Sequence, residues 1–400
     1  MDAGKKDWMS LSDRYIMHTY GRSPVTLVEG KGCRVFDSDG KMYLDFVAGI
    51  AVCNLGHAHP AVAEAVCRQA QKLVHVSNLY YTVPQIKLAE LLIEHSFADQ
   101  VFFCNSGAEA NEAAIKLARK YSRDRFGEGR HEIICLKDSF HGRTLATLSA
   151  TGQEKFHKGF EPLVEGFKHV SAGDLGAMKQ ALTEKTCAIL MEPIQGEGGV
   201  VSFSPDYLPA VRKLCDEHGL LLILDEVQVG MGRTGTLFAH EHYGIKPDMM
   251  TLAKALANGL PLGALLAREE VASSFTPGTH ASTFGGNPVA CAAATVVLKT
   301  LLEGKLLSHC QEMGGYFRQG LEGLVVRYPS LIEEVRGLGL ILGLVLKVEG
   351  VDFVTNLLRK GFLINCTQGN ILRFTPPLIV TRAEIDLLLA ALDEECRKRL

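Results

Sequence analysis

Short runs of apolar residues recur along the chain, and each of them stops abruptly at polar residues. An unbroken apolar run of this length predicts a strand that is buried on both faces of a parallel sheet. We expect such strands over residues 101–104, 133–136, 188–191, 220–224 and 249–252. In open α/β sheets, ligands lie beyond the carboxyl ends of the strands. The polar residues that follow the runs are therefore the first candidates for a functional site.

The flanking parts of the chain have other patterns. Residues 11–60 alternate short apolar pieces with Gly and Asp turn signals, which predicts a small antiparallel meander, and a helical pattern begins at Pro60. From Gly304 the order becomes helix, strand, helix, with an amphipathic helix at the end. The predicted fold class is α/β, with a mostly parallel central sheet flanked by helices and a smaller α+β domain. We expect an N-terminal segment that belongs to the small domain (1–60), a large domain (61–290) and a C-terminal small domain (291–400).

Composition narrows the class of protein. Of 400 residues 47% are hydrophobic, and this length suggests roughly two to three domains. A net charge of -3 without a Lys/Arg cluster offers no surface for nucleic acid. The longest apolar stretches, 289–298 and 338–346, are too short to span a membrane, and residues 1–17 lack an apolar signal core. Eleven scattered cysteines without a CxxC pair indicate reduced thiols and a cytoplasmic location. His57 and His59 lack a third ligand at a recognisable spacing, so we expect no metal.

Two of the predicted strands deliver opposite charges. The run 220–224 leads into Asp225, and the run 249–252 leads to Lys254, so the two side chains could meet at one edge of the sheet. An ATPase also has a strand that ends in Asp-Glu, but no Gly-Lys pair of this chain is followed by the Ser or Thr of a phosphate loop. The glycines of 230–235 have GxGxxG spacing without the apolar helix of a dinucleotide site, which favours a loop.

A lysine and an aspartate at one site would suit an aldehyde cofactor. Burial and a nearby cation lower the pKa of a lysine, and its neutral amine can then attack an aldehyde. Pyridoxal phosphate is the aldehyde cofactor that uses such a lysine, and its ring nitrogen needs an anionic partner to stay protonated. Taken alone, however, Asp225 and Lys254 are explained at least as well by ordinary structural roles, an aspartate that caps a turn and a lysine on the surface.

Other strand ends carry residues that this cofactor would need. Ser106 and Glu109 have the spacing of a capping box, and the free N–H groups of the helix that starts there make a site for a phosphate. Gly107 would let the phosphate approach the backbone closely. Phe140 could lie against a planar ring. Arg373 stands in an apolar run, and a buried arginine needs an anionic partner.

The chain contains a set of motifs that covers nearly its whole length. They are YIMHTYGR, LDFVAGIAV, LGHAHP, SNLYYT, NSGAEANEAAIKLAR, FHGRT, EPIQGEGG, LDEVQVGMGRTG, TLAKALANGLPLGA, STFGGNP and LRFTPPL. Together they resemble the class III, fold-type I pyridoxal-phosphate aminotransferases. The resemblance implies the fold-type I fold, an aminotransferase that uses pyridoxal 5′-phosphate, and a homodimer with active sites at the subunit interface.

The same resemblance implies roles at the cofactor. Lys254 would bind the aldehyde and act as the catalytic base, and Asp225 would pair with the ring nitrogen. Gln228 would hydrogen-bond the ring hydroxyl, and Phe140 would stack on the ring. The phosphate would be held by Ser106, Gly107 and Ala108, and by the loop with Ser282 and Thr283, whose threonine would reach the neighbouring subunit's site.

For the substrates, the resemblance implies transfer of the distal amine of N2-acetylornithine to 2-oxoglutarate, a step of arginine biosynthesis. Arg143 and Arg373 would bind substrate carboxylates, and Glu197 would pair with Arg373 in one half-reaction. Succinylornithine, ornithine and 4-aminobutyrate remain alternative amine donors. The family often has Val-Asn-Ala-Leu-Gly-His where this chain has Val-Cys53-Asn54-Leu-Gly-His, so the fine substrate preference stays open.

Overall fold

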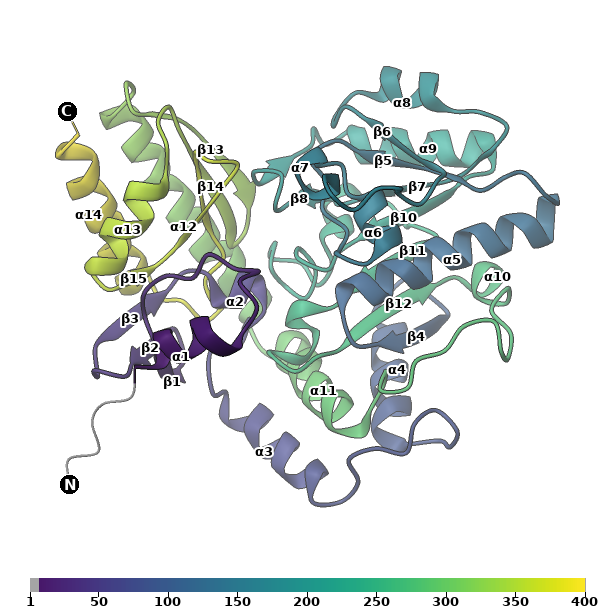
Figure 1. Cartoon of the computed structure of the whole chain (residues 1–400), viewed down its shortest axis with the longest axis horizontal. Helices are drawn as coiled ribbons and strands as arrows, with labels where there is room; N and C mark the ends of the chain where they lie inside the picture. The colour runs from purple at the N-terminus through teal and green to yellow at the C-terminus, as the bar shows by residue number, and fades with distance from the viewer. Residues whose placement is uncertain (1–6, 400) are drawn as a thin grey trace.

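A seven-stranded sheet forms the centre of the larger part of the molecule, which a computed structural model describes for residues 7–399 (Figure 1). Its strand order is β4-β12-β11-β10-β7-β5-β6, and only β12 runs antiparallel to its neighbours. The strands are β4 (Gln100–Cys104), β5 (Glu132–Leu136), β6 (Phe167–Val170), β7 (Thr186–Met191), β10 (Leu221–Asp225), β11 (Met249–Leu252) and β12 (Gly263–Ala267). Each of the five predicted apolar runs forms one of them, and the α/β prediction is confirmed, whereas β6 and β12 were not predicted.

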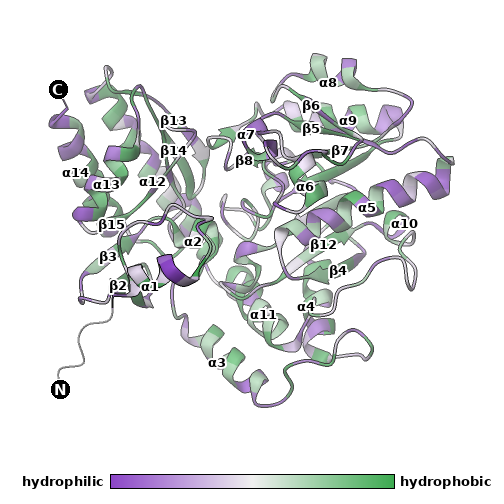
Figure 2. Ribbon diagram, in the orientation of Figure 1, coloured by the Kyte–Doolittle hydropathy of each residue, from purple (hydrophilic) through white to green (hydrophobic). Residues whose placement is uncertain are grey.

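Helices cover both faces of this sheet. In β10, Leu221 and Ile223 pack with residues of α5 (Gly107–Phe126), while Leu222 and Leu224 pack with residues of α9 (Tyr207–His218). Successive side chains of a strand point to opposite faces, so a strand covered on both sides needs an apolar residue at every position. Figure 2 shows the contrast: the strands of this sheet are mostly hydrophobic, whereas α5 carries many polar residues.

A group of helices packs against β11 and β12, with their residues in one buried hydrophobic cluster. There α11 (Pro288–Glu303) packs against α3 (Pro60–Ala70), α4 (Val83–Glu94) and the short helix η2 (Lys254–Ala257). The predicted division at residues 290 and 291 falls inside α11, so the chain crosses it within one continuous helix. Pro288 at the start and the Asn287 side chain, which accepts a hydrogen bond from the Ala290 N–H, account for where this helix begins.

The smaller part is built on an antiparallel sheet with the order β13-β14-β17-β16. Helix α12 packs on this sheet and on α14, and α13 packs beside α14. The elements are α12 (Leu306–Arg327), β13 (Ile332–Leu338), β14 (Ile341–Leu346), α13 (Val351–Arg359), β16 (Asn365–Thr367), β17 (Ile371–Phe374) and α14 (Arg382–Arg397).

The predicted N-terminal meander is present as three antiparallel strands, β1 (Leu27–Lys31), β2 (Arg34–Asp37) and β3 (Met42–Asp45). Strand β15 (Phe362–Leu363), from near the other end of the chain, pairs in parallel with β3. The N-terminal segment is therefore joined to the C-terminal part by backbone hydrogen bonds.

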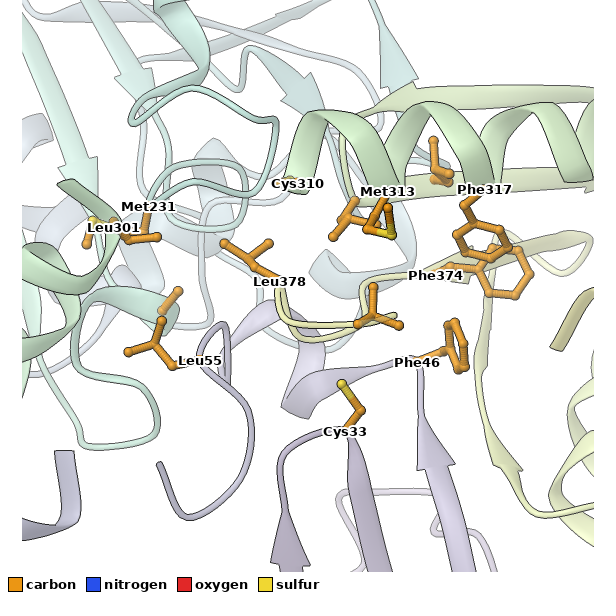
Figure 3. Packing of buried hydrophobic residues seen from close by; sticks show 14 of the residues in the cluster. Cys33, Phe46, Leu55, Met231, Leu301, Cys310, Met313, Phe317, Phe374 and Leu378 are labelled. Atoms are coloured by element: carbon orange, nitrogen blue, oxygen red, sulfur yellow. The ribbon is translucent and has the colours of Figure 1, made fainter. Parts of the chain in front are cut away.

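A cluster of buried hydrophobic residues links these segments to the central sheet (Figure 3). Phe317 of α12 packs against Phe46, with ring centroids 5.9 Å apart, and against Phe374 of β17 at 5.2 Å. The same buried cluster includes Met231, which belongs to the loop after β10. Because Phe374 directly follows Arg373, this packing holds the strand that carries Arg373 beside the central sheet.

The remaining elements are short. They are α1 (Trp8–Tyr15), α2 (Ala48–Ala51), α6 (Leu145–Ala150), α7 (Glu154–His157), α8 (Leu175–Ala181), β8 (Ile194–Gln195), β9 (Val201–Ser202), η1 (Ala239–Tyr243) and α10 (Glu269–Ala272). Between residues 7 and 399, no helix combines the length and the apolar character needed to cross a membrane.

Candidate active site

A cavity of about 390 Å³ opens at the carboxyl ends of the parallel strands. Its walls come from the loops that follow β4, β5, β7, β10 and β11. Eight of the predicted site residues line it: Ser106, Gly107, Ala108, Phe140, Arg143, Asp225, Gln228 and Lys254. Residues that are far apart in the chain therefore meet because each ends or follows a strand of one sheet.

A hydrogen-bond network fixes the carboxylate of Asp225, which is 3% exposed. Its Oδ2 accepts a hydrogen bond from Asn111 Nδ2 (2.7 Å) and lies 2.8 Å from His141 Nδ1, while Oδ1 accepts from the Val227 N–H (3.0 Å). Asn111 is itself held, because Thr251 Oγ1 donates to its Oδ1 (2.8 Å). The carboxylate thus reaches the cavity with its position already set, as an electrostatic partner requires.

Lys254 lies at the turn after β11, where it begins η2 with a φ of 39°. Left-handed backbone is uncommon and costly for a residue with a side chain, and it often occurs at functional sites. Burial lowers the pKa of the Lys254 ammonium, and Arg373 adds to this effect against the opposing carboxylates of Glu197 and Asp225. A lowered pKa raises the fraction of neutral amine, which is the nucleophilic form.

The start of α5 forms a cradle for an anion. Ser106 caps the helix by accepting a hydrogen bond from the Glu109 N–H (3.1 Å), while the Glu109 carboxylate accepts from the Asn105 N–H (2.6 Å). The expected capping box is therefore shifted by one residue on its acidic side. The N–H groups of Gly107 and Ala108 have no carbonyl partner within the helix and carry the positive end of its dipole.

The cradle depends on two glycines. A Cβ on Gly107 would lie 2.7 Å from Val227 Cγ1, and a Cβ on Gly142 would lie 2.8 Å from Ala108 Cβ. Both distances are too short for ordinary side chains, so only glycine keeps the space beside the first turn of α5 open. An open cradle, a buried carboxylate and a lysine with a lowered pKa at one cavity fit pyridoxal phosphate.

Phe140 and Arg143 stand on the loop after β5. The Phe140 N–H donates to Glu192 Oε1 (3.0 Å), and its ring meets Phe156 edge to face at 5.9 Å. The Arg143 guanidinium lies 3.9 Å from the centroid of Phe156 and is exposed at the rim of the cavity. A cation held over an aromatic face is oriented without a carboxylate partner, so its N–H groups stay available to an anionic ligand.

Glu197, Gln228 and Arg373 form a connected group behind the cavity wall. Arg373 is 1% exposed, and its Nη1 donates to Glu197 Oε1 (2.5 Å) and to Gln228 Oε1 (3.1 Å). Gln228 Nε2 donates to the same Glu197 oxygen (3.3 Å). Burial raises the pKa of Glu197, but Arg373, Lys254 and the hydrogen bonds outweigh burial and lower the pKa overall. The glutamate is therefore ionised opposite the arginine.

Glu192 is a further buried carboxyl group of the cavity wall. Its Oε1 accepts from the Phe140 N–H, and its Oε2 accepts from the Gly196 N–H (3.1 Å). Burial, together with the nearby Asp225 carboxylate and against His141, raises the pKa of Glu192 to about 7. This side chain joins the loop of Phe140 to the turn that carries Glu197.

Two predicted cofactor residues lie outside the cavity wall. Thr283 is exposed, and Ser282 is partly buried, with its Oγ accepting from Asn105 Nδ2 (3.3 Å) and from the Gly285 N–H (3.0 Å). Ser282 thus supports Asn105, which precedes the N-cap of α5. Within this one chain, Thr283 has no contact with the cavity.

The structure also shows where Cys53 and Asn54 lie, the two residues at which the chain differs from the family's usual sequence. Asn54 is fully buried, and its Nδ2 donates to the Met231 carbonyl (2.7 Å), so it supports the loop after β10. Val52, and neither Cys53 nor Asn54, lines the cavity. His57 turns to Asp45 (2.7 Å), and no cluster of three metal-ligating side chains occurs in the described part of the chain.

The sequence alone did not identify Asn111, His141 and Thr251 as site residues, and it gave no role to Glu192, although this glutamate directly follows the predicted strand 188–191. Asn111 and His141 had a readable signal: Asn111 is a polar residue among alanines on the helix that starts at the cradle, and His141 directly follows Phe140. Thr251 sits in an apolar run and carries no such signal. Its role depends on which helix crosses that strand, which the sequence does not specify.

Comparisons with known proteins point to one family. The model of the family described as "Aminotransferase class-III" matches residues 15–395. An acetylornithine aminotransferase of Methanocaldococcus jannaschii is 54% identical and covers 98% of both chains, and one of Caldanaerobacter subterraneus is 54% identical over 95% of this chain and 97% of its own. Among solved structures, the ornithine aminotransferase of Toxoplasma gondii has a TM-score of 0.95 at 34% identity, covering 98% of this chain and 94% of its own. The N-acetylornithine aminotransferase of Stenotrophomonas maltophilia has a TM-score of 0.84 at 38% identity, covering 96% and 97%.

Proposed function

Since the chain belongs to the class-III aminotransferase family, we propose that it transfers the distal amino group of N2-acetylornithine to 2-oxoglutarate. The products are N-acetylglutamate 5-semialdehyde and glutamate, a step of arginine biosynthesis. The protein is an aminotransferase that uses pyridoxal 5′-phosphate. Support for the substrate comes from relatives that share about half of their residues with this chain over nearly its full length and are named for acetylornithine.

The cavity residues divide the work of holding the cofactor. Pyridoxal phosphate supplies an aldehyde that accepts the amino group and a ring that takes up electrons from the substrate carbon. Asp225 would hold a proton at the ring nitrogen, and Phe140 would lie against the ring. Gln228 would donate to the ring hydroxyl with the second proton of its Nε2. The backbone N–H groups of Gly107 and Ala108, with the Ser106 hydroxyl, would bind the phosphate.

Lys254 would act twice. Its neutral amine is the residue that would hold the cofactor aldehyde between reactions. With the cofactor and substrate bound, the free Lys254 amine would take the proton from the substrate carbon that bears the amino group and hold it at Nζ for its return during the transfer. General acid–base catalysis of this kind contributes about 10²- to 10⁴-fold to the rate.

The observation that carries the proposal is the ion pair of Glu197 with Arg373. Acetylornithine reacts at the amine far from its carboxylate, whereas glutamate reacts at the amine beside its α-carboxylate. The part of the site next to the reacting carbon must therefore bind a carboxylate when glutamate is the substrate, and none when acetylornithine is the substrate. A buried arginine that is paired with a half-buried glutamate can do this. Glu197 neutralises Arg373 while acetylornithine is bound, with the acetylornithine α-carboxylate on Arg143, and withdraws when glutamate or 2-oxoglutarate binds.

The working unit is a homodimer in this proposal. Leu79, Tyr80 and Tyr81 are at least 70% exposed, and the exposed ring of Phe284 directly follows Thr283. Apolar side chains grouped on a surface favour burial against a partner. Thr283 would then complete the phosphate cradle of the neighbouring subunit. The cytoplasmic location expected from the cysteines stays a prediction.

The test is a panel of amine donors with 2-oxoglutarate as the acceptor. We expect acetylornithine to have the highest kcat/KM among acetylornithine, succinylornithine, ornithine and 4-aminobutyrate. A higher value for any of the other three would replace the proposed substrate without changing the reaction class. If none of the four donors yielded glutamate, the proposed transamination to 2-oxoglutarate would be wrong.

A mixing experiment tests the dimer. Chains with Thr283→Ala and chains with Lys254→Ala are each expected to be weakly active or inactive at limiting cofactor. If Thr283 serves the partner's site, a mixed dimer has one intact site, and mixing should restore about a quarter of wild-type activity. No gain on mixing, with exchange of chains verified by mass, would contradict a shared site.

A further inference from the structure

Gln228 separates the cavity from the ion pair that switches the carboxylate site. It lines the cavity and is 7% exposed. Its Oε1 accepts from Arg373 Nη1 (3.1 Å), and its Nε2 donates to Glu197 Oε1 (3.3 Å). One neutral side chain therefore contacts both members of the pair.

The two N–H groups of Arg373 Nη1 have separate partners. One faces Glu197 and the other faces Gln228, while Nη2 donates to the amide oxygen of Asn365 (2.7 Å), whose NH₂ group donates to the Arg373 carbonyl oxygen (3.2 Å). When Glu197 withdraws, only its own N–H group is released. The bonds to Gln228 and Asn365 remain, and they keep the guanidinium from turning after the departing carboxylate.

The chain also keeps room for this amide. A Cβ on Gly196 would overlap Gln228 Oε1, although the backbone of Gly196 is not in the left-handed region. Glycine is therefore needed at this position for the space that Gln228 occupies and not for the conformation of the turn. The turn of Glu197 and the amide of Gln228 are built to fit each other.

We propose that Gln228 is a specificity-determining residue of the carboxylate site. It keeps Arg373 aimed at the cavity once Glu197 has withdrawn, and because it is neutral it leaves the positive charge of Arg373 available to a dicarboxylate. This inference rests on the proposed exchange between acetylornithine and glutamate. A carboxylate at position 228 would instead neutralise Arg373 permanently and oppose dicarboxylate binding.

The experiment uses the holoenzyme with Gln228→Glu and with Glu197→Gln, two substitutions of nearly equal size that change charge in opposite directions. Single-turnover rates are measured for acetylornithine and for glutamate, and the ratio of their kcat/KM values is compared. Binding of glutarate, a dicarboxylate that cannot react, is measured by calorimetry. N-acetylnorvaline, which lacks the reacting amine of acetylornithine, is the matched probe for the other substrate.

Gln228→Glu should slow both half-reactions but shift the ratio toward acetylornithine by about tenfold or more, the size expected for losing one charge-assisted contact. Glutarate should lose about as much affinity relative to N-acetylnorvaline. Glu197→Gln should shift the ratio toward glutamate. If Gln228→Glu does not fold, Gln228→Ala replaces it and should weaken glutarate more than N-acetylnorvaline.

Equal losses for both substrates and both probes, or shifts of the two variants in the same direction, would overturn the inference. A failure of the proposed function looks different. In that case the wild-type enzyme would not convert acetylornithine, whereas the glutarate measurement would still report whether Gln228 orients Arg373.

Discussion

Asp225→Asn is the sharpest test of the network behind the cofactor. The substitution keeps the shape of the side chain but replaces one carboxylate oxygen by an NH₂ group. Two donors meet at Oδ2, from Asn111 and His141, and the Val227 N–H meets Oδ1. Whichever way the new amide is turned, its NH₂ group must face at least one of these donors, because an amide has only one acceptor oxygen.

The size of the effect follows from this count. A buried donor left without an acceptor costs about 1–3 kcal/mol, so the apoprotein should lose about that much of its free energy of unfolding. Loss of the charge acts separately on the reaction. Removal of one preorganised electrostatic partner typically lowers the rate about 10²- to 10³-fold, and we expect a loss of transamination in this range.

Urea unfolding of the apoprotein measures the first effect, and single-turnover rates of the holoenzyme measure the second. Thr251→Val is the matched control, because it removes the hydroxyl that donates to Asn111 Oδ1 but leaves the charge of Asp225 in place. The control should lose stability with a much smaller loss of rate. If the Asp225→Asn apoprotein were as stable as the wild type and the holoenzyme rate stayed within about tenfold of it, the Asp225 network would have neither of these roles.

Three further predictions concern single side chains. The hydrogen bond to Asp45 is the main cause that raises the pKa of His57 to about 10, so the stability lost in His57→Ala should be full below pH 6.5 and vanish as the pH rises through about 10; urea unfolding across this range checks it, and a constant difference would contradict it. Gly107→Ala would place a Cβ 2.7 Å from Val227 Cγ1. Titration of the apoprotein should show a larger loss of affinity for pyridoxal phosphate than for pyridoxal, and equal losses would argue against a phosphate cradle. In Lys254→Ala, borohydride should attach no cofactor to the protein and turnover should cease, as mass spectrometry and assay would show.

Local sequence determined the central strands because their burial is written into single segments. In β10, which α5 covers on one face and α9 on the other, every residue before Asp225 is apolar. The ends of these runs therefore marked Asp225 and Lys254 as site residues. Strand β12 was not predicted. Its residues, GALLA, follow a loop and pair antiparallel with both neighbours, so the strand lacks the preceding crossover helix that is typical of parallel strands.

The network around the site needed long-range information. Asn111 contacts Asp225 across 114 positions of the chain, and Gln228 contacts Arg373 across 145. No periodicity or motif spacing encodes such pairs, because they depend on how two separate elements pack. The packing of Phe374 on Phe317 helps to fix the position of the adjacent Arg373.

The residue types and local patterns of the chain already define the available chemistry: a lysine and an aspartate at strand ends, a helix start suited to a phosphate, and an arginine in an apolar run. How these groups act on one another depends on the packing of distant segments. Burial lowers the pKa of Lys254, the network of Asn111 and His141 fixes Asp225, and Gln228 lies between the cavity and the ion pair. Residue types and local patterns are properties of short segments, whereas desolvation and hydrogen-bond geometry arise only when distant segments pack together.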